Sequence, residues 1–499
     1  LKAVWEVFME SLIHRKIYRV NPVLGFMHMS LAFGWLLLIV VGWVEAVFVL
    51  GPGTPLQAHV FFRFFDNSAA HGGFNIFALV MDLILLMVLM GVGLAWVERM
   101  RSKALGMKRT TKHVFIDRVA LSALWLIFPL RLISESLTAA VKHNGSFLTG
   151  GLGDFFASFM GAGALEPVGY VAWWCYSIAL GVFFVAMPFS RYMHIFTEIP
   201  LIFLRHYKLR SSAEAPGSYD DFQIQACSRC GICIDPCQLQ KDLGIHNVQS
   251  VYFLRDRRYN KMTEEVLDNC LMCGLCEDRC PVGIELNTLR LNSRSAAIDT
   301  PADNRYAYLG GLDRSQGDGK VGYFAGCMTL LTPATMQSME RIFAAAGEEV
   351  WWADREGGAC CGRPLKLSGE VTAARKMMDY NKSLFRRHGI DTLVTSCPIC
   401  LKVFKEDYNL GAGIEVLHHS EYIERLVAAG RINIASTGKT YTYHDPCVHG
   451  RGSGIYDAPR NVIAMAGTLL EPENTRDNAP CCRRSLANTV NNGGQPAKV

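Results

Sequence analysis

Hydrophobic and polar residues divide the chain into two regions of different character. Four long apolar stretches lie near residues 23–50, 74–97, 114–137 and 168–189. Each is long enough, as a helix, to cross about 30 Å of hydrocarbon. Beyond residue 221 the apolar runs are short and alternate with polar segments, as in soluble domains. The pattern therefore predicts a multidomain protein, with an all-α four-span transmembrane domain at 1–209 followed by soluble domains.

The basic residues indicate how the predicted spans are oriented. Lys and Arg gather in residues 14–19, 99–112 and 191–210, whereas the other two links between spans are rich in Gly. Because basic segments stay in the cytoplasm, both ends of the bundle are predicted to lie on the cytoplasmic side of the inner membrane. An even number of spans gives the same answer. Residues 1–20 read either as an amphipathic surface helix or as the end of a further span.

Two histidines occupy matching depths in the predicted bundle. His28 lies just inside the cytoplasmic start of the first span, and His194 just beyond the cytoplasmic end of the fourth. Opposite-running helices bring such residues to one level, as the two axial ligands of a haem b require. The alternative is a buried polar His28 and an interfacial His194. The pattern favours one haem b near the cytoplasmic face.

Ionisable residues also occur in the outer half of the predicted spans, at Asp82, Arg131 and Glu135. Charges inside a membrane are costly and usually serve a function. These three are candidates for binding haem propionates, lining a quinone pocket or relaying protons. For Arg131 and Glu135 the alternative is an ion pair between residues four apart that reaches the membrane surface.

The cysteines concentrate in the soluble region. Sixteen of the 17 lie after residue 226, and the remaining one, Cys175, lies in the fourth apolar stretch. Clustered Cys-x2-Cys spacing indicates metal ligation in a reducing compartment rather than disulfides. The net charge of +5 gives no special support for nucleic-acid binding. The soluble region is thus predicted to carry metal centres that transfer electrons.

A polar linker at 210–221 leads to a predicted ferredoxin domain at 222–300. It contains two runs of Cys-x2-Cys-x2-Cys-x3-Cys, the spacing of bacterial ferredoxins, in which the fourth cysteine of each run binds the other cluster. Zinc is the disfavoured alternative. Predicted helices at 250–262 and 264–268, between the runs, suggest an α-helical ferredoxin. The predicted ligands are Cys227, Cys230, Cys233 and Cys280 for one [4Fe-4S] cube, and Cys270, Cys273, Cys276 and Cys237 for the other.

Residues 301–499 form the third predicted domain, an α/β domain with an internal repeat at 321–400 and 441–499. In the first repeat, strands at 321–325, 349–353 and 392–395 alternate with helices at 333–346 and 370–388. Its cysteines are Cys327, Cys360, Cys361, Cys397 and Cys400. The second repeat contains Cys447, Cys481 and Cys482 at parallel spacing. Loops at strand ends are where α/β folds build their sites.

The two repeats resemble the CCG-type cysteine-rich domain of heterodisulfide reductases and their relatives. The matching stretches are Phe324–Cys327, Ala359–Gly362, Thr395–Cys400, His444–Cys447 and Gly454–Arg460. The resemblance implies that the five cysteines of the first repeat hold an irregular [4Fe-4S] centre. A purely structural thiol cluster is the alternative.

The second repeat departs from the family, because Arg483 and Arg484 stand where glycines are expected and no final Cys-x2-Cys follows. We therefore expect either a truncated or altered sequence, or a degenerate site. A second irregular cluster is not predicted. The cysteines of the second repeat would complete or adjoin the site of the first repeat.

The membrane region resembles the haem-bearing γ-type subunit of respiratory nitrate reductases. The likeness rests on Gly25–His28, Trp173–Trp174 and Pro188–His194. Those relatives often carry a further histidine where this chain has Tyr176, which argues against a second haem. The order of the three domains is similar to fused, quinone-linked members of the heterodisulfide reductase group. That group includes proteins connecting sulfur metabolism or electron-transfer flavoprotein to membrane quinone.

Three hypotheses for function follow. The first is an oxidoreductase that passes electrons between a soluble flavoprotein or other redox subunit and menaquinone or another quinone. The second is a quinol-dependent reductase that cleaves a disulfide or sulfur compound at the irregular centre. The third is a non-catalytic subunit that conducts electrons within a larger complex. The chain has no nucleotide-binding Gly-rich motif, so flavin chemistry is expected from a partner.

Overall fold

The computed structural model describes residues 1–66, 76–100, 113–209, 217–297, 313–357 and 359–482. It contains two compact units, one of Leu1–Arg210 with Asp221–Asp235 and one of Ser211–Asp220 with Pro236–Val499. Several predictions lie outside the described residues. They are the basic link at 101–112, most of the 210–221 linker, the start of the third domain and Arg483–Arg484.

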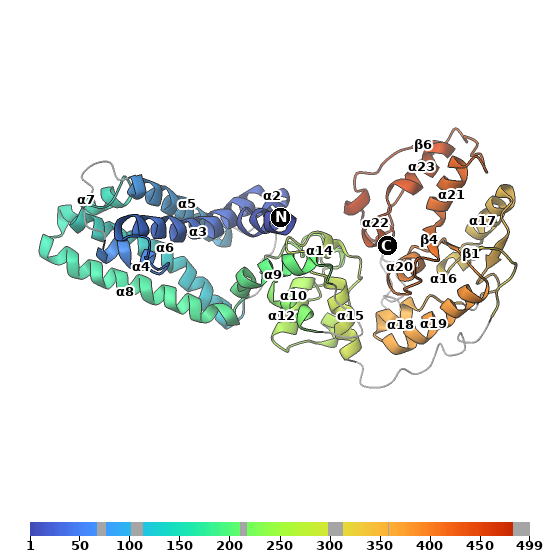
Figure 1. The fold of residues 1–499 in the computed structure, drawn as a ribbon, viewed down its shortest axis with the longest axis horizontal. Coiled ribbons are helices and arrows are strands. Elements are labelled where there is room, and N and C mark those ends of the chain that lie inside the picture. The colour runs from blue at the N-terminus through green and yellow to red at the C-terminus, as the bar shows by residue number, and fades with distance from the viewer. Residues whose placement is uncertain (67–75, 101–112, 210–216, 298–312, 358, 483–499) are drawn as a thin grey trace. The chain divides into compact units, whose positions relative to one another are not determined.

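The first unit is helical (Figure 1). Its long helices are α3 (Pro22–Leu50), α5 (Ile76–Met100), α6 (Phe115–Lys142) and α8 (Ala162–Ala186). Its short ones are α1 (Lys2–Val7), η1 (Phe8–Leu12), α2 (Arg15–Val20), α4 (Ala58–Phe61), η2 (Phe62–Asp66), α7 (Thr149–Phe159), η3 (Met187–Phe189), η4 (Arg191–Met193) and α9 (His194–His206). Asn21 caps α3 by accepting hydrogen bonds from the amides of Val23 and Leu24, and Pro22 fits the first helical position.

Three helical segments are long and apolar enough to cross a membrane: Pro22–Leu50, Ile76–Val97 and Gly163–Phe189. The sequence predicts four spans. The remaining one coincides with the 28-residue helix α6, which is not among these three and buries Asp117, Arg131 and Glu135. Helices α6 and α8 pack closely along their length. The described residues thus support three candidate spans and a helix with charged groups inside the bundle.

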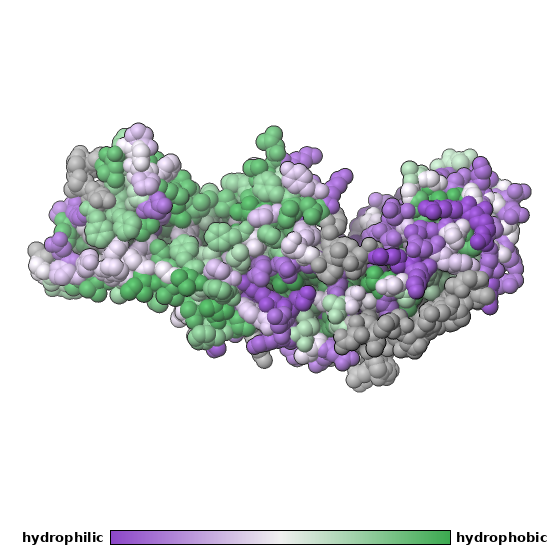
Figure 2. Space-filling model, turned by 60° about the horizontal axis from the view of Figure 1, so that its bottom comes forward, coloured by the Kyte–Doolittle hydropathy of each residue, from purple (hydrophilic) through white to green (hydrophobic). Residues whose placement is uncertain are grey.

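Apolar side chains cover much of the visible surface of the helical unit, whereas hydrophilic residues dominate the visible face of the β-strand region (Figure 2). Phe48, Val171 and Val185 are each at least 60% exposed on α3 and α8. Large apolar side chains gathered on one exterior are unfavourable in water and favourable against lipid. The surface therefore agrees with association of this unit with a membrane.

Six short helices accompany the ferredoxin cysteines along the chain. They are α10 (Ser218–Gln225), α11 (Gln238–Leu243), α12 (Ser250–Arg258), α13 (Glu264–Asp268), α14 (Leu275–Asp278) and α15 (Leu286–Ala296). The predicted helix at 264–268 is confirmed, and the one predicted at 250–262 ends at Arg258. The prediction of a helical insert between the two cysteine runs is confirmed.

The third region contains a parallel four-stranded sheet in the order β2-β1-β3-β4. The strands are β1 (Val321–Phe324), β2 (Val350–Trp352), β3 (Thr392–Thr395) and β4 (Glu415–His418). Neighbouring residues point to opposite faces. Tyr323 packs into the core on one face and Phe324 into the core on the other. Helices α17 (Pro333–Ala346) and α21 (His419–Ala428) cover the first face, and α19 (Val371–Arg387) and α20 (Pro398–Glu406) cover the second (Figure 1).

The second copy is a smaller version of the same arrangement. Strands β5 (Thr440–Tyr441) and β6 (Thr468–Leu469) pair in parallel, with helix α23 (Asp457–Ala466) between them in the chain. Strands β1 and β2 are related in the same way through α17. The remaining short helices are α16 (Cys327–Leu330), α18 (Arg363–Ser368), α22 (Gly450–Ser453) and η6 (Arg476–Asn478).

Candidate functional site

The five cysteines of the first copy gather at the carboxyl edge of the four-stranded sheet. Cys327 begins α16, with two residues between it and the end of β1, and Cys360-Cys361 precede α18. One residue separates Cys397 from the end of β3, and Cys397 caps α20, which contains Cys400. Parallel strands end at the same edge, so residues far apart in sequence meet there. Four of the five are buried, and Cys327 is half-buried.

The thiols of this set lie in contact with one another. Cys361 hydrogen-bonds with Cys360 and Cys400, Cys400 also with Cys397, and Cys327 lies within electrostatic range of Cys361 and Cys397. Gly326 makes the close packing possible. A Cβ atom there would lie 2.7 Å from Cys397 Cβ and 3.0 Å from Cys400 Sγ, at a backbone φ of +86°. That combination admits only glycine without strain.

Burial and hydrogen bonding give these thiols unequal acidity. Burial raises the pKa of Cys327 to about 11. Hydrogen bonds from Cys360 and Cys400 hold the pKa of Cys361 well below its usual range. Because thiolates are the iron ligands and the nucleophiles, Cys361 is the member best prepared for either role.

Polar groups beneath the site fix its backbone. Asn381 Nδ2 donates to the Cys360 carbonyl (2.8 Å), and the Tyr408 hydroxyl donates to the Cys361 carbonyl (3.3 Å). Asp354 accepts hydrogen bonds from the amides of Ala325 (2.8 Å) and Gly326 (2.7 Å). Burial raises the pKa of Asp354 to about 6. Sequence reasoning missed Asn381, Tyr408 and Asp354, which lie outside the cysteine motifs.

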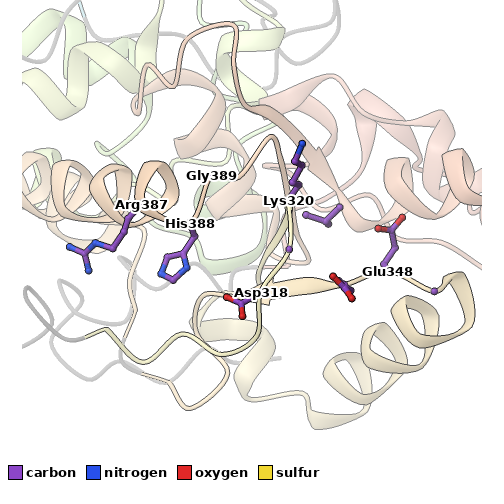
Figure 3. A pocket seen from close by; sticks show the side chains of 10 residues that line it. Asp318, Lys320, Glu348, Arg387, His388 and Gly389 are labelled. Atoms are coloured by element: carbon purple, nitrogen blue, oxygen red, sulfur yellow. The ribbon is translucent and has the colours of Figure 1, made fainter.

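A hollow of about 750 Å³ lies at the opposite, amino edge of the same sheet (Figure 3). Its charged side chains include Asp318, Lys320, Glu348 and Arg387. Glu348 is paired with Arg431, and Arg387 lies 3.6 Å from Asp313. Sites in open parallel sheets form at the carboxyl edge, so we do not treat this hollow as the functional site.

The second unit also brings together the four predicted ligands of one ferredoxin cube. Cys237 and Cys276 each lie within electrostatic range of Cys270, and Cys276 also of Cys273. The Met272 amide donates to Cys270 Sγ (3.4 Å), and the Ser250 hydroxyl lies 3.1 Å from Cys276 Sγ. Burial raises the pKa of Cys273 to about 12. Binding of iron would therefore release protons from these thiols.

Two arginines of α15 hold the loop that carries these cysteines. Arg290 donates to the carbonyls of Val266, Leu267 and Val248. Arg294 donates to the carbonyls of Leu267, Asp268 and Leu367. The loop is therefore fixed through its own backbone rather than through its side chains.

The same loop contacts the helix that follows the cysteine pair of the first copy. Leu367 belongs to α18, which is capped by Gly362 and begins at Arg363, two residues after Cys361. The apolar residues Met272, Leu291 and Leu367 pack together beside Cys270. The loop of the predicted cube and the helix after Cys361 are therefore in direct contact within one unit.

The first three cysteines of the first ferredoxin run belong to the helical unit, through residues 221–235. Arg229, between Cys227 and Cys230, donates from Nη2 to Asp117 Oδ1 on α6 (2.7 Å). The Arg191 amide donates to the same oxygen (2.8 Å), and Asp117 is fully buried. This buried ion pair ties the cysteine loop to the bundle. Cys280, the fourth predicted ligand, belongs to the other unit.

A cavity of about 760 Å³ lies inside the helical unit, and both predicted haem histidines line it. His194 Nδ1 donates to the Arg191 carbonyl (2.7 Å), so Nε2 carries the ring's lone pair. His28 stacks on His14, with ring centroids 5.5 Å apart. His14 was not predicted, because it stands outside the apolar stretches. Further lining residues are Trp35, Trp125, Phe128, Phe183, Arg118, Arg191, Ser228 and Cys230.

The outer charged residues separate into two groups. Asp82 accepts hydrogen bonds from the Leu148 and Thr149 amides and from the Thr149 hydroxyl, and so holds the start of α7. Arg131 pairs with Glu135 (2.8 Å), and both are buried within the bundle.

A second buried pair, missed by sequence reasoning, lies close to the first. Glu45 and Arg63 are joined by two hydrogen bonds of 2.9 and 3.2 Å. Glu45 is within electrostatic range of both Arg131 and Glu135. Two cations thus balance two anions, which lowers the cost of keeping all four in the bundle.

In the second copy, Cys447 and Cys481 meet, with their Sγ atoms 3.7 Å apart. Cys481 is buried and Cys482 is exposed. Both Cys447 and Cys481 lie within electrostatic range of Cys273 in the predicted cube. The second set therefore adjoins the ferredoxin region. Among the described residues, no group of three or more potential ligands is positioned around a single metal ion.

Three histidines, of which His418 and His449 are buried and His419 is half-buried, join the two copies. The rings of His418 and His419 lie 4.1 Å apart, and those of His418 and His449 lie 4.0 Å apart. Burial lowers the pKa of His419 and of His449 to about 4, and holds the pKa of His418 well below its usual range. All three are therefore neutral at physiological pH. Sequence reasoning missed this cluster, because His418 ends β4 and His419 begins α21, whereas His449 comes from the second copy.

Comparison with protein families supports the two soluble sites. Residues 223–284 match the model of the 4Fe-4S dicluster domain, and residues 321–405 match that of the cysteine-rich domain. These matches support iron–sulfur clusters in both regions. Haem remains a prediction. No solved structure matches the chain.

Curated relatives extend the likeness over most of the chain. EtfAB:quinone oxidoreductase of Syntrophomonas wolfei is 21% identical, over 96% of this chain and 80% of its own. One subunit of the dihydromethanophenazine:CoB--CoM heterodisulfide reductase of Methanosarcina barkeri is 24% identical, over 52% of this chain and 78% of its own. A probable membrane-anchored ferredoxin of Chromohalobacter salexigens is 25% identical, over 54% of this chain and 39% of its own.

These relatives and the two matched domains indicate an iron–sulfur electron-transfer oxidoreductase. It is related to a heterodisulfide reductase component and to EtfAB:quinone oxidoreductase. The three candidate spans and the likeness to a membrane-anchored ferredoxin indicate association with a membrane.

Proposed function

We propose that this protein passes electrons between a soluble electron-transfer flavoprotein and menaquinone in the cytoplasmic membrane. In this proposal the flavoprotein donates at the cysteine-rich domain, and the clusters and one haem b serve as one-electron carriers. The soluble domains face the cytoplasm, as the basic residues predict. The likeness to EtfAB:quinone oxidoreductase supports this choice of partners.

The observation that carries the proposal is the composition of the cavity in the helical unit. Two histidines, His28 and His194, and one predicted cluster ligand, Cys230, line the same space. A haem site and a cluster loop that share a cavity wall would bring two electron carriers close together. The ion pair of Arg229 with Asp117 holds the loop against the bundle.

The residues of the cavity fit a haem b. His28 and His194 would supply its two nitrogen ligands, and the Nδ1 hydrogen bond of His194 orients that ring. Trp35, Trp125 and Phe128 would offer apolar contacts to the macrocycle. The guanidinium groups of Arg118 and Arg191 would offer positive charge to the propionates.

For the irregular [4Fe-4S] centre, we propose Cys327, Cys360, Cys361, Cys397 and Cys400 as ligands. For the cubes, we propose Cys227, Cys230, Cys233 and Cys280 in one, and Cys237, Cys270, Cys273 and Cys276 in the other. Spacing and the contacts within the second unit support the irregular centre and the second cube. A fourth membrane span at α6, and a quinone or proton role for Arg131 and Glu135, belong to the same proposal.

The test is a measurement of haem and its redox response in the full chain, purified in detergent. His28→Ala and His194→Ala should each abolish the b-type absorbance. His59→Ala, a histidine of α4 outside the cavity lining, is the matched control and should leave it unchanged. A menaquinol analogue should reduce the haem of the parent. A haem that quinol never reduces and quinone never oxidises would refute quinone linkage.

A second candidate function is reduction of a disulfide or sulfur compound at the cysteine-rich domain. The half-buried position of Cys327, in an otherwise buried set, favours it by leaving one side open to a substrate. Quinol-dependent turnover of a disulfide by the isolated chain would support this function. Electron transfer from reduced flavoprotein, without disulfide turnover, would support the first.

A further inference from the structure

The thiols of Cys447 and Cys481 form a pair that the proposed electron path does not use. Their Sγ atoms lie 3.7 Å apart, close enough for a small movement to join them. Two nearby cysteines held in one environment form a potential two-electron redox couple.

The loop that carries Cys447 is firmly held. Asp445, two residues earlier, accepts hydrogen bonds of 2.7 Å on each carboxylate oxygen from Arg460. Its Oδ2 also accepts one from the Arg476 amide (2.7 Å). Asp445 is buried, so the pair strongly constrains the loop.

Cys481 is held from the ferredoxin side. Its amide donates to Gln238 Oε1 (2.9 Å), and its carbonyl accepts from Gln238 Nε2 (3.3 Å). Gln238 directly follows Cys237, a proposed ligand of the second cube. The thiol pair is thereby tied to the backbone that would surround that cluster.

Arg451 makes a second connection to the same cluster loop. Its Nε donates to the Cys273 carbonyl (3.2 Å), and its Nη1 donates to the Ala479 carbonyl (2.6 Å). One side chain thus joins the segment before Cys481 to a second proposed ligand of the cube. Gln238 and Arg451 together keep the thiol pair beside Cys273.

From this arrangement we infer that Cys447 and Cys481 form a reversible dithiol–disulfide couple that exchanges electrons with the adjacent cluster. The inference rests on the proposed cube held by Cys237, Cys270, Cys273 and Cys276. In the reductive direction the S–S bond breaks as the disulfide accepts two electrons, which the cluster, when bound, would supply one at a time. Two protons from solvent then complete two thiols. Oxidation of the dithiol reverses each step.

The test uses the full chain, purified without oxygen and with its clusters retained. It is equilibrated in dithiothreitol buffers of graded redox potential, alkylated and digested for mass spectrometry. A peptide linking Cys447 to Cys481 is expected at oxidising potentials, and two alkylated cysteines at reducing ones. Cys447→Ser and Cys481→Ser should abolish the link. Cys482→Ser should preserve it, which assigns the bond to Cys481 rather than its neighbour.

Iron content and the cluster signals in electron paramagnetic resonance separate the possible failures. If Cys447→Ser loses iron, the pair ligates metal and the inference is wrong, while the proposed function stands. Absence of a linked peptide at every potential also overturns the inference. If the parent lacks the signals of the two cubes, the proposed function itself fails. A linked peptide in the parent, with unchanged iron in all three variants, supports the couple.

Discussion

The two cysteine-rich copies hold their cysteines in different surroundings. In the first copy, five cysteines gather at the edge of a four-stranded sheet, with helices on both faces. In the second, Cys447 and Cys481 follow a two-stranded sheet, and Cys482 is exposed. The members of the first set contact one another, and four of the five are buried. In the second copy, hydrogen bonds that involve Gln238 and Arg451 connect the cysteine loops to the ferredoxin region.

The difference teaches how a repeated motif can take separate roles. The first copy has a buried interior in which several thiols contact one another, as a cluster site requires. The second has one close thiol pair and a strong ion pair, Arg460 with Asp445, in place of a large core. We therefore expect mutations in the first copy to affect cluster content most, and mutations in the second to affect stability and thiol chemistry.

The largest contrast should come from removing one cysteine from each copy. Cys361→Ser should eliminate the irregular centre and lower the rate of electron transfer by about 100-fold or more. Loss of a metal ligand should lower the rate more than loss of a residue that only supports a ligand. Cys482→Ser should change both by less than about twofold, since that side chain is exposed. Iron analysis and the rate of quinone reduction measure the effect. Equal losses in the two variants would remove the distinction between the copies.

Breaking the ion pair of the second copy should mainly affect stability. Arg460→Met leaves the buried Asp445 carboxylate without its partner and should cost about 3–5 kcal/mol. Denaturant unfolding of the purified chain, followed by tryptophan fluorescence, measures the change. The double variant Arg460→Met, Asp445→Leu should recover part of the loss. A stability unchanged by the single variant would show that the pair does not support this copy.

Matched glycine substitutions compare the packing of the two copies. Gly326→Ala combines a positive φ with contacts of 2.7 and 3.0 Å to Cys397 and Cys400, and should cost about 3–4 kcal/mol. At Gly452 the nearest atom to an added Cβ is 3.4 Å away, so Gly452→Ala should cost less than about 1 kcal/mol. Thermal unfolding and iron content test both. If the two substitutions lower stability by similar amounts, the first copy is less tightly packed around Gly326 than the short contacts indicate.

Lowering the pH should change the stability contributions of two buried aspartates, Asp354 in the first copy and Asp445 in the second, in opposite directions. Burial raises the pKa of Asp354 to about 6 from an ordinary value of 3.8, so its contribution to stability falls as pH rises between these values, by at most about 3 kcal/mol. Burial also raises the pKa of Asp445, but hydrogen bonds from Arg460 outweigh it and lower the pKa overall. The contribution of Asp445 is therefore lost as pH falls below 3.8.

Unfolding measured from pH 4 to 7 in Asp354→Asn, with Asp445→Asn as the control, isolates the contribution of Asp354. The first substitution should remove the part of the parent's pH dependence that falls with rising pH. The second should leave that part intact. Identical pH profiles in the parent and Asp354→Asn would contradict the raised pKa.

Local patterns predicted many of the elements. The sequence located α17, β3 and α13 at their observed bounds, because proline, alternating apolar residues or a Thr263 cap mark their ends. Strand β4 and helices α20 and α21 were missed, since they follow the cysteine motifs without a turn signal of their own. Helix α6 was predicted as a span that carries Arg131 and Glu135, but its third buried charge, Asp117, was missed.

The candidate cluster cysteines and the two histidines proposed to bind haem could be predicted because metal ligands recur at fixed spacings or matching depths. Their supporting residues were not. His14, Asn381 and Gln238 lie far along the chain from the groups they contact, and nothing in their local sequence marks a partner. The buried pair of Glu45 and Arg63 was missed for the same reason. Contacts of this kind depend on tertiary packing.

The ion pair between Arg229 and Asp117 has a consequence for how such proteins exchange parts. The chain passes between the compact units after Arg210, after Asp220 and again after Asp235, so the last of these divisions falls inside the ferredoxin motif. Recombination at the linker would combine Asp117 of one parent with the residue that the other parent has at position 229. Recombination after Asp235 would transfer the soluble region and leave this buried pair together. Inheritance of the ferredoxin in two pieces would thus keep this buried ion pair intact.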